Sequence, residues 1–477
     1  MLLVKSITPK KINVLSLGRY AITTILIACF FPAFSQDNSP YTRYGLGDIV
    51  PSTNINSRAM GGISAAYTDP YGVSINFNNP ASFSRFQTTP EPNSKSRIRA
   101  GRAVLDVGIN LDYRTLREQD NSAKFTSSNI LFSHVQVGMP ISQKWGFSFG
   151  LRPLTRIAYK IAQFERIFDP NTGANIDSAF TQYEGEGGTY LVSGGIGIKL
   201  VDNKRHYLSI GGNAGYQFGE KDYSTKRIFI NDTVDYYRAN YETKTSLGNW
   251  HFDLGIQYKA LLDSAKGLYL GFGAYGNLQN IMRGVRDEVR ETYVADPTMG
   301  NTQLDSVSEV KGVVGDVIYP ASYTVGFTLE SMPRDIKKAG WMFGVDYNFG
   351  KWSDYRYYGQ KDSTQDKWEL RMGGELRPAP AGKNYFSYVT YRAGFFVGED
   401  YIKVKESLPL WGATFGMALP LSNQGMRYGT PNQSTMINLA FEYIKRGKSD
   451  NLLRDNIFRV SFGMSLSDLW FLKRKYE

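Results

Sequence analysis

The chain has 477 residues, with 48 glycines, 32 tyrosines and 28 phenylalanines, and its mean hydropathy is slightly polar. This composition suits many β-strands joined by tight turns, and it argues against a mainly helical or doubly wound protein. The formal net charge is +11, but no nucleic-acid-binding motif accompanies it, so we expect a basic surface and no nucleic-acid partner.

Residues 1–35 have the pattern of an export signal. An apolar run, YAITTILIACFFPAF, is followed by the small-x-small site Ala33-Phe34-Ser35, and four basic residues precede it: Lys5, Lys10, Lys11 and Arg19. Cys29 is the only cysteine, so the mature chain is expected to lack disulfides. The stretch LIAC, which ends at Cys29, also resembles a lipoprotein cleavage box. The apolar run continues beyond it, which favours ordinary cleavage, but a lipidated Cys29 stays open.

Residues 36–100 form an irregular segment ahead of the first regular one. Its stretch SINFNNPASFSRF, residues 74–86, has neither the helical period nor the alternation of a strand. Glycine, proline and asparagine punctuate the whole segment, as in turns.

From residue 101 to residue 466 the dominant pattern is alternation of apolar and polar residues. In NIFRVSFGMSL, for example, Phe458, Phe462 and Met464 share one face, while Arg459 and Ser461 share the other. Fourteen such segments are predicted as strands, near residues 101–113, 127–139, 144–156, 184–200, 206–218, 248–260, 266–280, 317–330, 340–351, 367–377, 384–397, 408–419, 435–446 and 454–466. Most exceed the five or six residues that are usual in soluble sheets, and they suit strands that cross a hydrocarbon layer.

The connections differ at the two ends of the predicted strands. Residues 157–183, 219–247 and 281–316 are predicted as long loops, whereas 140–144 and 201–205 are short turns. This asymmetry is typical of an up-and-down barrel in the bacterial outer membrane, with long loops outside the cell. We therefore predict an all-β fold, a 14-stranded antiparallel transmembrane barrel in contact with outer-membrane lipid and lipopolysaccharide. A soluble sandwich or propeller is the less favoured alternative.

Side chains alone fill an eight-stranded barrel, but not one of fourteen strands with a Gly- and Ser-rich inner face. Residues 36–100 are long enough to close such a lumen and are predicted to be its plug, or hatch. Alternation also places charged residues of both signs on the inner face, among them Arg152, Asp346, Glu369, Arg371, Glu375, Arg392, Glu442 and Arg459. We expect these to pair with one another and with Arg43, Asp48, Arg58 and Asp69 of the plug.

The stretch SRAMGGISAAYTDPYGVSINFNNPASF resembles the hatch of the FadL-like outer-membrane barrels, the long-chain fatty-acid transporters and their PorV-like branch. The matching positions are Gly61, Gly62, Ala65, Ala66, Asp69 and Asn79-Pro80-Ala81. The resemblance implies fourteen strands and passive uptake of hydrophobic small molecules, with a hatch that shifts to open a path. The charged inner face departs from the mostly apolar pocket that an acyl chain needs.

No constellation of catalytic, metal-binding or cofactor-binding residues stands out. The three histidines, His134, His206 and His251, lack ligand-like spacing, and no Ser/His pair for acyl hydrolysis can be matched. We therefore expect no enzyme, no metal and no cofactor. Residues 467–477 form a basic-aromatic tail, expected in the periplasm, that could contact the membrane interface or a partner.

Two functions remain after these exclusions. The first is a plug-gated channel for hydrophobic or amphipathic small molecules. The second is a barrel that transports nothing and serves as a subunit of an envelope export or outer-membrane assembly complex, with partners at its tail or its extracellular loops.

Overall fold

The computed structural model describes residues 39–470, except 93, 95, 120–123, 169, 174, 231–236, 297–299, 334, 336, 380–383 and 422–432. The predicted export signal, residues 1–35, lies outside the described residues, as does the end of the predicted tail. Among the described residues, no helix is long and apolar enough to cross a membrane.

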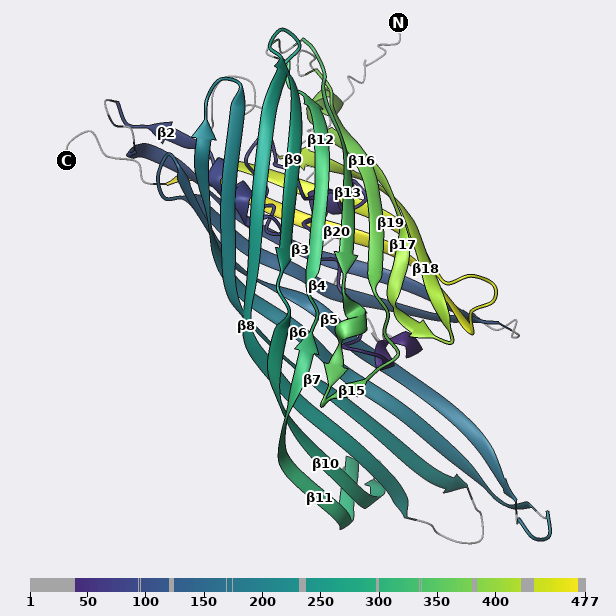
Figure 1. The fold of residues 1–477 in the computed structure, drawn as a ribbon. Coiled ribbons are helices and arrows are strands. Elements are labelled where there is room, and N and C mark those ends of the chain that lie inside the picture. The colour runs from purple at the N-terminus through teal and green to yellow at the C-terminus, as the bar shows by residue number, and fades with distance from the viewer. Residues whose placement is uncertain are drawn as a thin grey trace, which may run out of the picture. The chain divides into compact units, whose positions relative to one another are not determined.

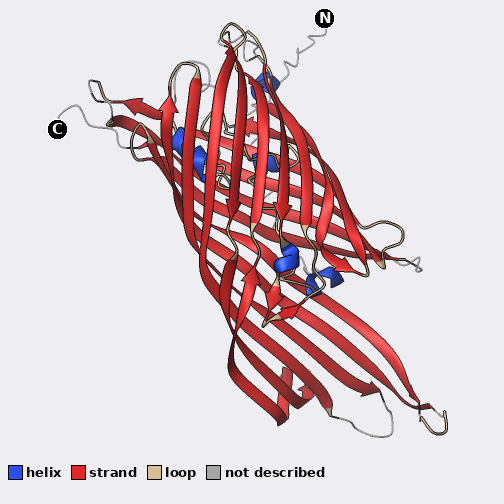
Figure 2. Ribbon diagram, viewed as in Figure 1, coloured by secondary structure: helices blue, strands red, loops and turns tan. Residues whose placement is uncertain are grey.

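The described chain is almost entirely antiparallel β-structure (Figures 1 and 2). Its long strands are β3 (Ile98–Glu118), β4 (Lys124–Pro140), β5 (Trp145–Phe168), β6 (Asn175–Asp202), β7 (His206–Ile230), β8 (Arg238–Asp263), β9 (Leu268–Asn277), β10 (Asn280–Asp296), β11 (Gly300–Tyr319), β12 (Ser322–Ser331), β13 (Gly340–Gly350), β16 (Lys367–Arg377), β17 (Thr390–Val404), β18 (Glu406–Pro420), β19 (Gln433–Arg446) and β20 (Leu453–Trp470). The short elements are β1 (Asp48–Ile49), β2 (Thr88–Pro90), β14 (Arg356–Tyr357), β15 (Gln360–Lys361), α2 (Ile55–Arg58), η1 (Pro40–Arg43), η2 (Pro80–Arg85), η3 (Trp352–Asp354) and η4 (Tyr385–Tyr388).

The strands form a closed barrel because β20 pairs with β3 along eighteen register positions, from Leu453↔Glu118 to Trp470↔Gly101. Strands β9 and β10 continue one another, as do β11 and β12, so the wall has fourteen strands. The predicted 14-stranded antiparallel barrel is therefore confirmed. Strand β20 runs to Trp470, past the predicted end at residue 466.

Alternation along each strand separates the two faces of the wall. On β20, Phe458 and Met464 are 46% and 38% exposed, whereas Arg459, Ser461 and Ser465 are buried. Trp145, Tyr190, Trp250, Trp341, Trp411 and Tyr443 are among the exposed aromatic residues near strand ends. An apolar, aromatic outer face is what strands present to lipid.

The three long loops predicted from the sequence are wrong, because most of their residues belong to strands. The ladder between β5 and β6 continues to Phe168↔Asn175, that between β7 and β8 begins at Arg227↔Ala239, and β10 pairs with β11 out to Asp296↔Gly300. These outer stretches carry polar residues on both faces, so they lack the alternation that reveals a half-buried strand. The outer parts of β5–β8, with β10 and β11, are called the extension below.

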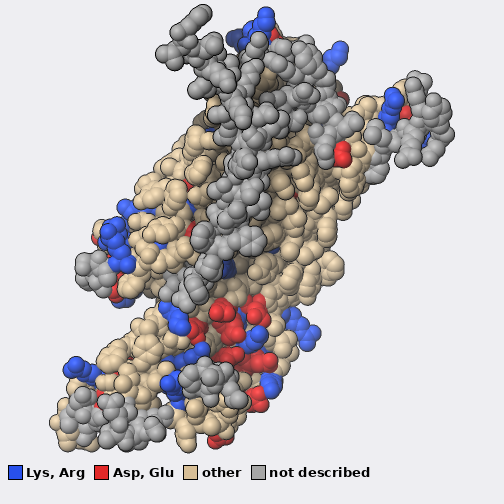
Figure 3. Space-filling view, turned by 180° about the vertical axis from the view of Figure 1, so that it is seen from behind, with Lys and Arg blue, Asp and Glu red and all other residues tan. Residues whose placement is uncertain are grey.

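Charged side chains mark the extension on the molecular surface (Figure 3). Glu184 pairs with Lys160 and Lys226, with nitrogen–oxygen distances of 2.9 and 2.6 Å, and Glu220 pairs with Lys244 at 3.2 Å. Because such residues are costly in a hydrocarbon layer, the extension lies beyond the membrane-crossing part of the barrel.

The wall is interrupted between β4 and β5. Their pairing stops at Val135↔Leu151, although β4 continues to pair with β3 as far as Lys124. Pro153 follows at once, and proline has no N–H for a ladder. Beyond this point β1, rather than β4, pairs with β5, at Asp48↔Arg156 and Ile49↔Thr155.

Candidate functional site

Residues 39–97, called the N-terminal segment below, contact the inward-facing side chains of the wall. Arg58 ends the short helix α2 and is 2% exposed. Its guanidinium donates hydrogen bonds to five neutral oxygens: the side chains of Asn110, Ser133 and Ser461, and the carbonyls of Pro51 and Thr53. Burial lowers the pKa of Arg58 to about 10, so it stays charged at neutral pH. This one side chain joins α2 to three strands of the wall.

Gly61 and Gly62 follow α2 with φ angles of +70° and +92°, which favour glycine. The Gly61 N–H donates to Thr414 Oγ1 at 2.8 Å, and a Cβ at Gly61 would lie 2.9 Å from the carbonyl oxygens of Met372 and Phe395. The backbone at Gly61 therefore lies directly on the wall, at a distance that no side chain would allow.

Asp346 on β13 receives the next stretch of the N-terminal segment. Its Oδ2 accepts the N–H groups of Ser64 and Ala65, at 2.7 and 2.8 Å. A carboxylate that accepts two backbone N–H groups fixes both the position and the direction of the chain. The side chain of Asp346 is fully buried in this contact.

Asn79-Pro80-Ala81 begins the 3-10 helix η2. The Asn79 side chain accepts from the Ala81 N–H at 3.2 Å, and it donates to the carbonyls of Ala65 and Ile256, at 2.7 and 3.1 Å. Asn79 thus caps η2 and joins it to β8. Gly211 and Gly255 of the wall leave room for this approach, because a Cβ at either would overlap Pro80 or Asn79.

Asp48 on β1 lies between two wall arginines. Its carboxylate oxygens lie 2.8 Å from Arg114 Nη2 of β3 and 2.8 Å from Arg446 Nη1 of β19. Asp400 and Asp455 also contact these arginines, at 2.6 Å from Arg446 Nε and 3.0 Å from Arg114 Nη1. Burial alone would raise the pKa of Asp48, but Arg446 and Arg114 outweigh it and lower the pKa to about 2. We call these five residues the Asp48 cluster.

The other charged residues predicted for the plug have different partners. The partners of Asp69 lie within its own segment, because its carboxylate accepts the N–H groups of Tyr71, Val73 and Ser74. Arg43 is exposed and lies over the ring of Tyr183, 5.4 Å from the ring centre. Of the four predicted plug charges, the structure places Asp48 in ion pairs with the wall.

The eight inner-face charges named in the sequence analysis are all buried. They pair mostly along the wall: Arg371 with Glu369 at 3.0 Å, Arg392 with Glu375 at 3.1 Å, Arg459 with Glu442 at 3.7 Å, and Arg152 with Asp253 at 3.9 Å. Several also reach the N-terminal segment, for Arg152 donates to the carbonyl of Ser52 and Arg392 to the side chain of Asn56, both at 3.1 Å.

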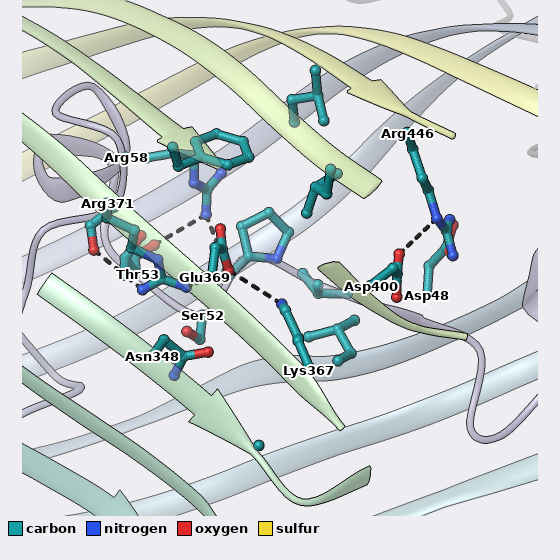
Figure 4. A pocket seen from close by; sticks show the side chains of 18 of the residues that line it. Asp48, Ser52, Thr53, Arg58, Asn348, Lys367, Glu369, Arg371, Asp400 and Arg446 are labelled. Atoms are coloured by element: carbon teal, nitrogen blue, oxygen red, sulfur yellow. Dashed lines mark hydrogen bonds and ion pairs between the residues drawn. The ribbon is translucent and has the colours of Figure 1, made fainter. Parts of the chain in front are cut away.

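A cavity of about 240 Å³ lies between the N-terminal segment and the wall (Figure 4). Asp48, Ser52 and Arg58 line it from the segment, and Lys367 and Arg371 line it from the wall. Its cationic lining residues outnumber its acidic ones by six to four: Arg58, Arg114, Lys367, Arg371, Arg446 and Arg459 against Asp48, Glu369, Asp400 and Glu442. Such a lining suits a polar or charged group better than a hydrocarbon chain.

Two groupings were missed from the sequence. Arg114, Arg446, Asp400 and Asp455 of the Asp48 cluster lie at the outer ends of strands, where alternation gives weak guidance. The structure also brings Ser133 Oγ within 3.1 Å of His134 Nδ1, and His134 Nε2 within 3.5 Å of Asp106, a contact that the sequence analysis did not predict. All three residues are buried, and Ser133 Oγ accepts a bond from Arg58, which blocks it as a nucleophile.

Within the described part of the chain, no group of three or more His, Cys, Asp or Glu residues is placed to hold a metal ion.

The family model called BamG matches residues 17–477, nearly the whole chain. The chain belongs to the BamG family. No curated protein matches it. The expected outer-membrane location of this BamG-family protein is confirmed, since a closed barrel with an apolar outer face is the form in which strands cross that membrane.

Several solved structures are similar to this BamG-family chain. They include a FadL homologue of Pseudomonas aeruginosa, with 13% identity, a TM-score of 0.49, and coverage of 90% of this chain and 100% of that one. The toluene transporter TodX of Pseudomonas putida has 13% identity and a TM-score of 0.47, with 89% and 99% covered. The monoaromatic hydrocarbon channel CymD has 13% identity and a TM-score of 0.45, with 87% and 97% covered.

Proposed function

We propose that this protein is a plug-gated outer-membrane channel for amphipathic small molecules, and that the N-terminal segment is its plug. The observation that carries the proposal is the interruption of the wall between β4 and β5, where β1 takes the place of a wall strand. A small displacement of β1 would open this gap sideways, beside the charged cavity. While β1 moves, the rest of the plug would stay in place. It would be held by the close contacts of Gly61 and Gly62 with the wall and by the cap at Asn79-Pro80-Ala81.

The cavity supports a substrate with a charged head group rather than a pure hydrocarbon. Its lining carries charged side chains of both signs, and Arg114 and Arg459 are also paired with Asp455 and Asp112 behind it, so the cavity favours a polar or charged group. In this proposal the inner-face pairs, such as Arg371 with Glu369, form the polar wall along which the head group passes. The proposed substrates are therefore small molecules that have both an apolar part and a polar group. Pure hydrocarbons are not among them.

A second candidate function is that of a non-transporting subunit of an outer-membrane assembly or export complex. Two observations favour it. The N-terminal segment is anchored by Arg58, Asp346 and the Asp48 cluster, which is more than a freely moving gate needs. The extension also builds a large ordered surface beyond the membrane, which a diffusion channel does not require.

A disulfide lock distinguishes the two candidates. Ile49 and Thr155 are register partners, so cysteines at both positions can form a bridge that fixes β1 on β5. The assay is entry of a fluorescent medium-chain carboxylic acid into proteoliposomes. A channel predicts flux that is lost when the bridge forms and restored by reduction, while Thr155→Cys alone is insensitive to oxidation. No flux in either state, with stoichiometric envelope proteins co-purifying in mild detergent, would favour the second candidate.

A further inference from the structure

Residues 351–366, called the lid below, connect β13 to β16 at the end of the barrel that carries the extension (Figure 1). They contain η3, β14 and β15. Because Gly350 of β13 pairs directly with Lys367 of β16, the wall closes without the lid. The lid itself pairs with β11 at two positions of β14 and with β17 through an isolated bridge, Thr364↔Ile402. It can therefore move without breaking a ladder between wall strands.

The lid packs against the beginning of the N-terminal segment through an aromatic cluster. Trp352 and Tyr355 of the lid are buried in one cluster with Tyr41 of the segment. The ring centres of Trp352 and Tyr401 of β17 lie 4.2 Å apart in the same cluster. Trp352 also lines the cavity between the segment and the wall. The lid is thus part of the boundary of that cavity.

Gly45 of the N-terminal segment is held by the lid through both of its backbone polar groups. Its N–H donates to Asp362 Oδ2 at 2.8 Å, and its carbonyl accepts from the Tyr355 hydroxyl at 3.1 Å. Lys221 Nζ of β7 donates to the same carbonyl at 2.9 Å. The φ of Gly45 is +61°, and a Cβ there would lie 2.7 Å from the ring of Tyr401. Only bare backbone therefore fits between the lid and β17.

This contact also holds β1. Gly45 precedes Asp48 by three residues, so the two lie at most about 10 Å apart even in a fully extended chain. At the other end of β1, the Val50 N–H donates to the Leu154 carbonyl of β5 at 3.0 Å. Because three residues are a short tether, β1 can leave β5 only if Gly45 leaves the lid or if the lid moves with it.

The tip of the lid has a strained backbone. Tyr358 has a φ of +51°, which is unfavourable for a residue other than glycine. Its N–H donates to the Asp316 carbonyl at 2.9 Å, and its ring packs so closely on Gly315 that a Cβ there would lie 2.1 Å from it. Strain of this kind persists only where neighbours enforce it, and it is common in segments that switch between two positions.

We propose that the lid holds β1 against β5, and that the gap between β4 and β5 opens only after the lid is released. This inference rests on the proposed function and adds its control. Gln360 and Lys361 at the tip of the lid are exposed, on the side that carries the extension. The sequence analysis places that side outside the cell, so the control acts from the side on which a substrate arrives.

Hydrogen exchange of the purified protein in detergent tests the hold on β1 without measuring transport. Asp362→Ala removes the acceptor of the Gly45 N–H, and Asp354→Ala, at an exposed position of the same lid, is the matched control. We expect Asp362→Ala to speed exchange of the Val50 amide about tenfold or more, and Asp354→Ala to leave it at the wild-type rate. An unchanged Val50 amide in Asp362→Ala would overturn the inference.

A second variant separates release of β1 from general loss of the fold. Tyr355→Phe keeps the buried ring and removes only the hydroxyl that donates to Gly45, so it should also speed exchange of the Val50 amide. Amides of the ladder between β19 and β20 should exchange at the wild-type rate in both lid variants. A Val50 amide that speeds up only together with this ladder would contradict the inference.

A disulfide in the lid tests its link to opening. Thr364 and Ile402 are bridge partners, and the hydrogen bonds beside them belong to their neighbours, such as the Gln365 N–H with the Tyr401 carbonyl. Partners of this kind have close Cα atoms, which suits a disulfide. In the flux assay, cysteines at both positions should abolish flux until the bridge is reduced. Ile402→Cys alone should be insensitive to oxidation.

The two disulfide locks allow the lid and the proposed function to fail separately. Flux that persists with the lid bridge formed, but stops when β1 is locked on β5, would overturn the role of the lid and leave the proposed function standing. No flux in the unlocked protein would count against the proposed function, while exchange of the Val50 amide still decides whether the lid holds β1.

Discussion

At the scale of single residues, buried charged side chains connect the N-terminal segment to the wall of the barrel. A buried charge is tolerated only when it is paired or fully hydrogen-bonded. Arg58 meets this condition with neutral oxygens, and Asp48 meets it with two arginines. The sequence predicted that both residues would pair with charges of the wall; Asp48 does so, whereas Arg58 bonds to neutral oxygens. The partners could not be chosen from the sequence, because they come from strands far apart in the chain.

Replacing Asp48 with asparagine is expected to loosen the N-terminal segment. The change leaves Arg114 and Arg446 with fewer acidic partners in a buried site, which costs about 3–5 kcal/mol when a pair is broken. We expect Asp48→Asn to raise ion conductance in a planar bilayer, while Asp450→Asn, at an exposed position, leaves it at the wild-type level. Equal conductance of the two variants would show that the Asp48 cluster does not hold β1.

The same carboxylate predicts how closure depends on pH. The pKa of Asp48 is lowered to about 2, so its stabilising ion pairs are fully present above its unfolded pKa of about 3.9. They are lost as the pH falls through about 2. Conductance of the wild-type barrel should stay low down to about pH 4 and rise below it. Asp48→Asn should lack this rise, and a rise near neutral pH would contradict the assignment.

At the scale of elements, alternation predicts a strand only where one face meets lipid and the other does not. That condition holds for the fourteen wall segments, and each was predicted from the sequence. The condition fails in the extension, because both faces of its sheet carry polar residues, such as the ion pair of Glu184 with Lys160. For this reason the sequence analysis predicted loops where the structure has strands. Near Asn384 a strand was predicted to begin where the structure has none. Residues 385–388 form the 3-10 helix η4, and strand β17 begins only at Thr390.

Gly61 provides a test of close packing between two elements. Gly61→Ala introduces a Cβ at a left-handed φ, and this Cβ also overlaps two wall carbonyls. Gly359 is a matched control, since its φ is +76° and nothing lies within 4 Å of a Cβ there. Both changes carry the strain of about 1–2 kcal/mol for the backbone, and only Gly61→Ala adds the overlap. We expect Gly61→Ala to lower the temperature at which the folded barrel unfolds on heat-modifiability gels, well below that of Gly359→Ala. Equal temperatures would mean that the segment does not pack there.

At the scale of the whole molecule, the chain combines a membrane-crossing barrel, a segment against its inner face, and an extension beyond the membrane. The barrel could be anticipated from the strand count, because alternation is local in sequence. The interruption beside Pro153 could not, because it depends on where the pairing between β4 and β5 stops.

The central claim is that the N-terminal segment closes the barrel. Deleting residues 40–97 while keeping the export signal leaves β3 and every later wall strand intact, so the variant should insert and fold. The decisive measurement is its ion conductance in a planar bilayer, beside the full chain and after heat-modifiability has shown a folded barrel. The account predicts steady open-channel conductance for the deletion variant and near-zero conductance for the full chain. A folded, inserted deletion variant as silent as the full chain would contradict it.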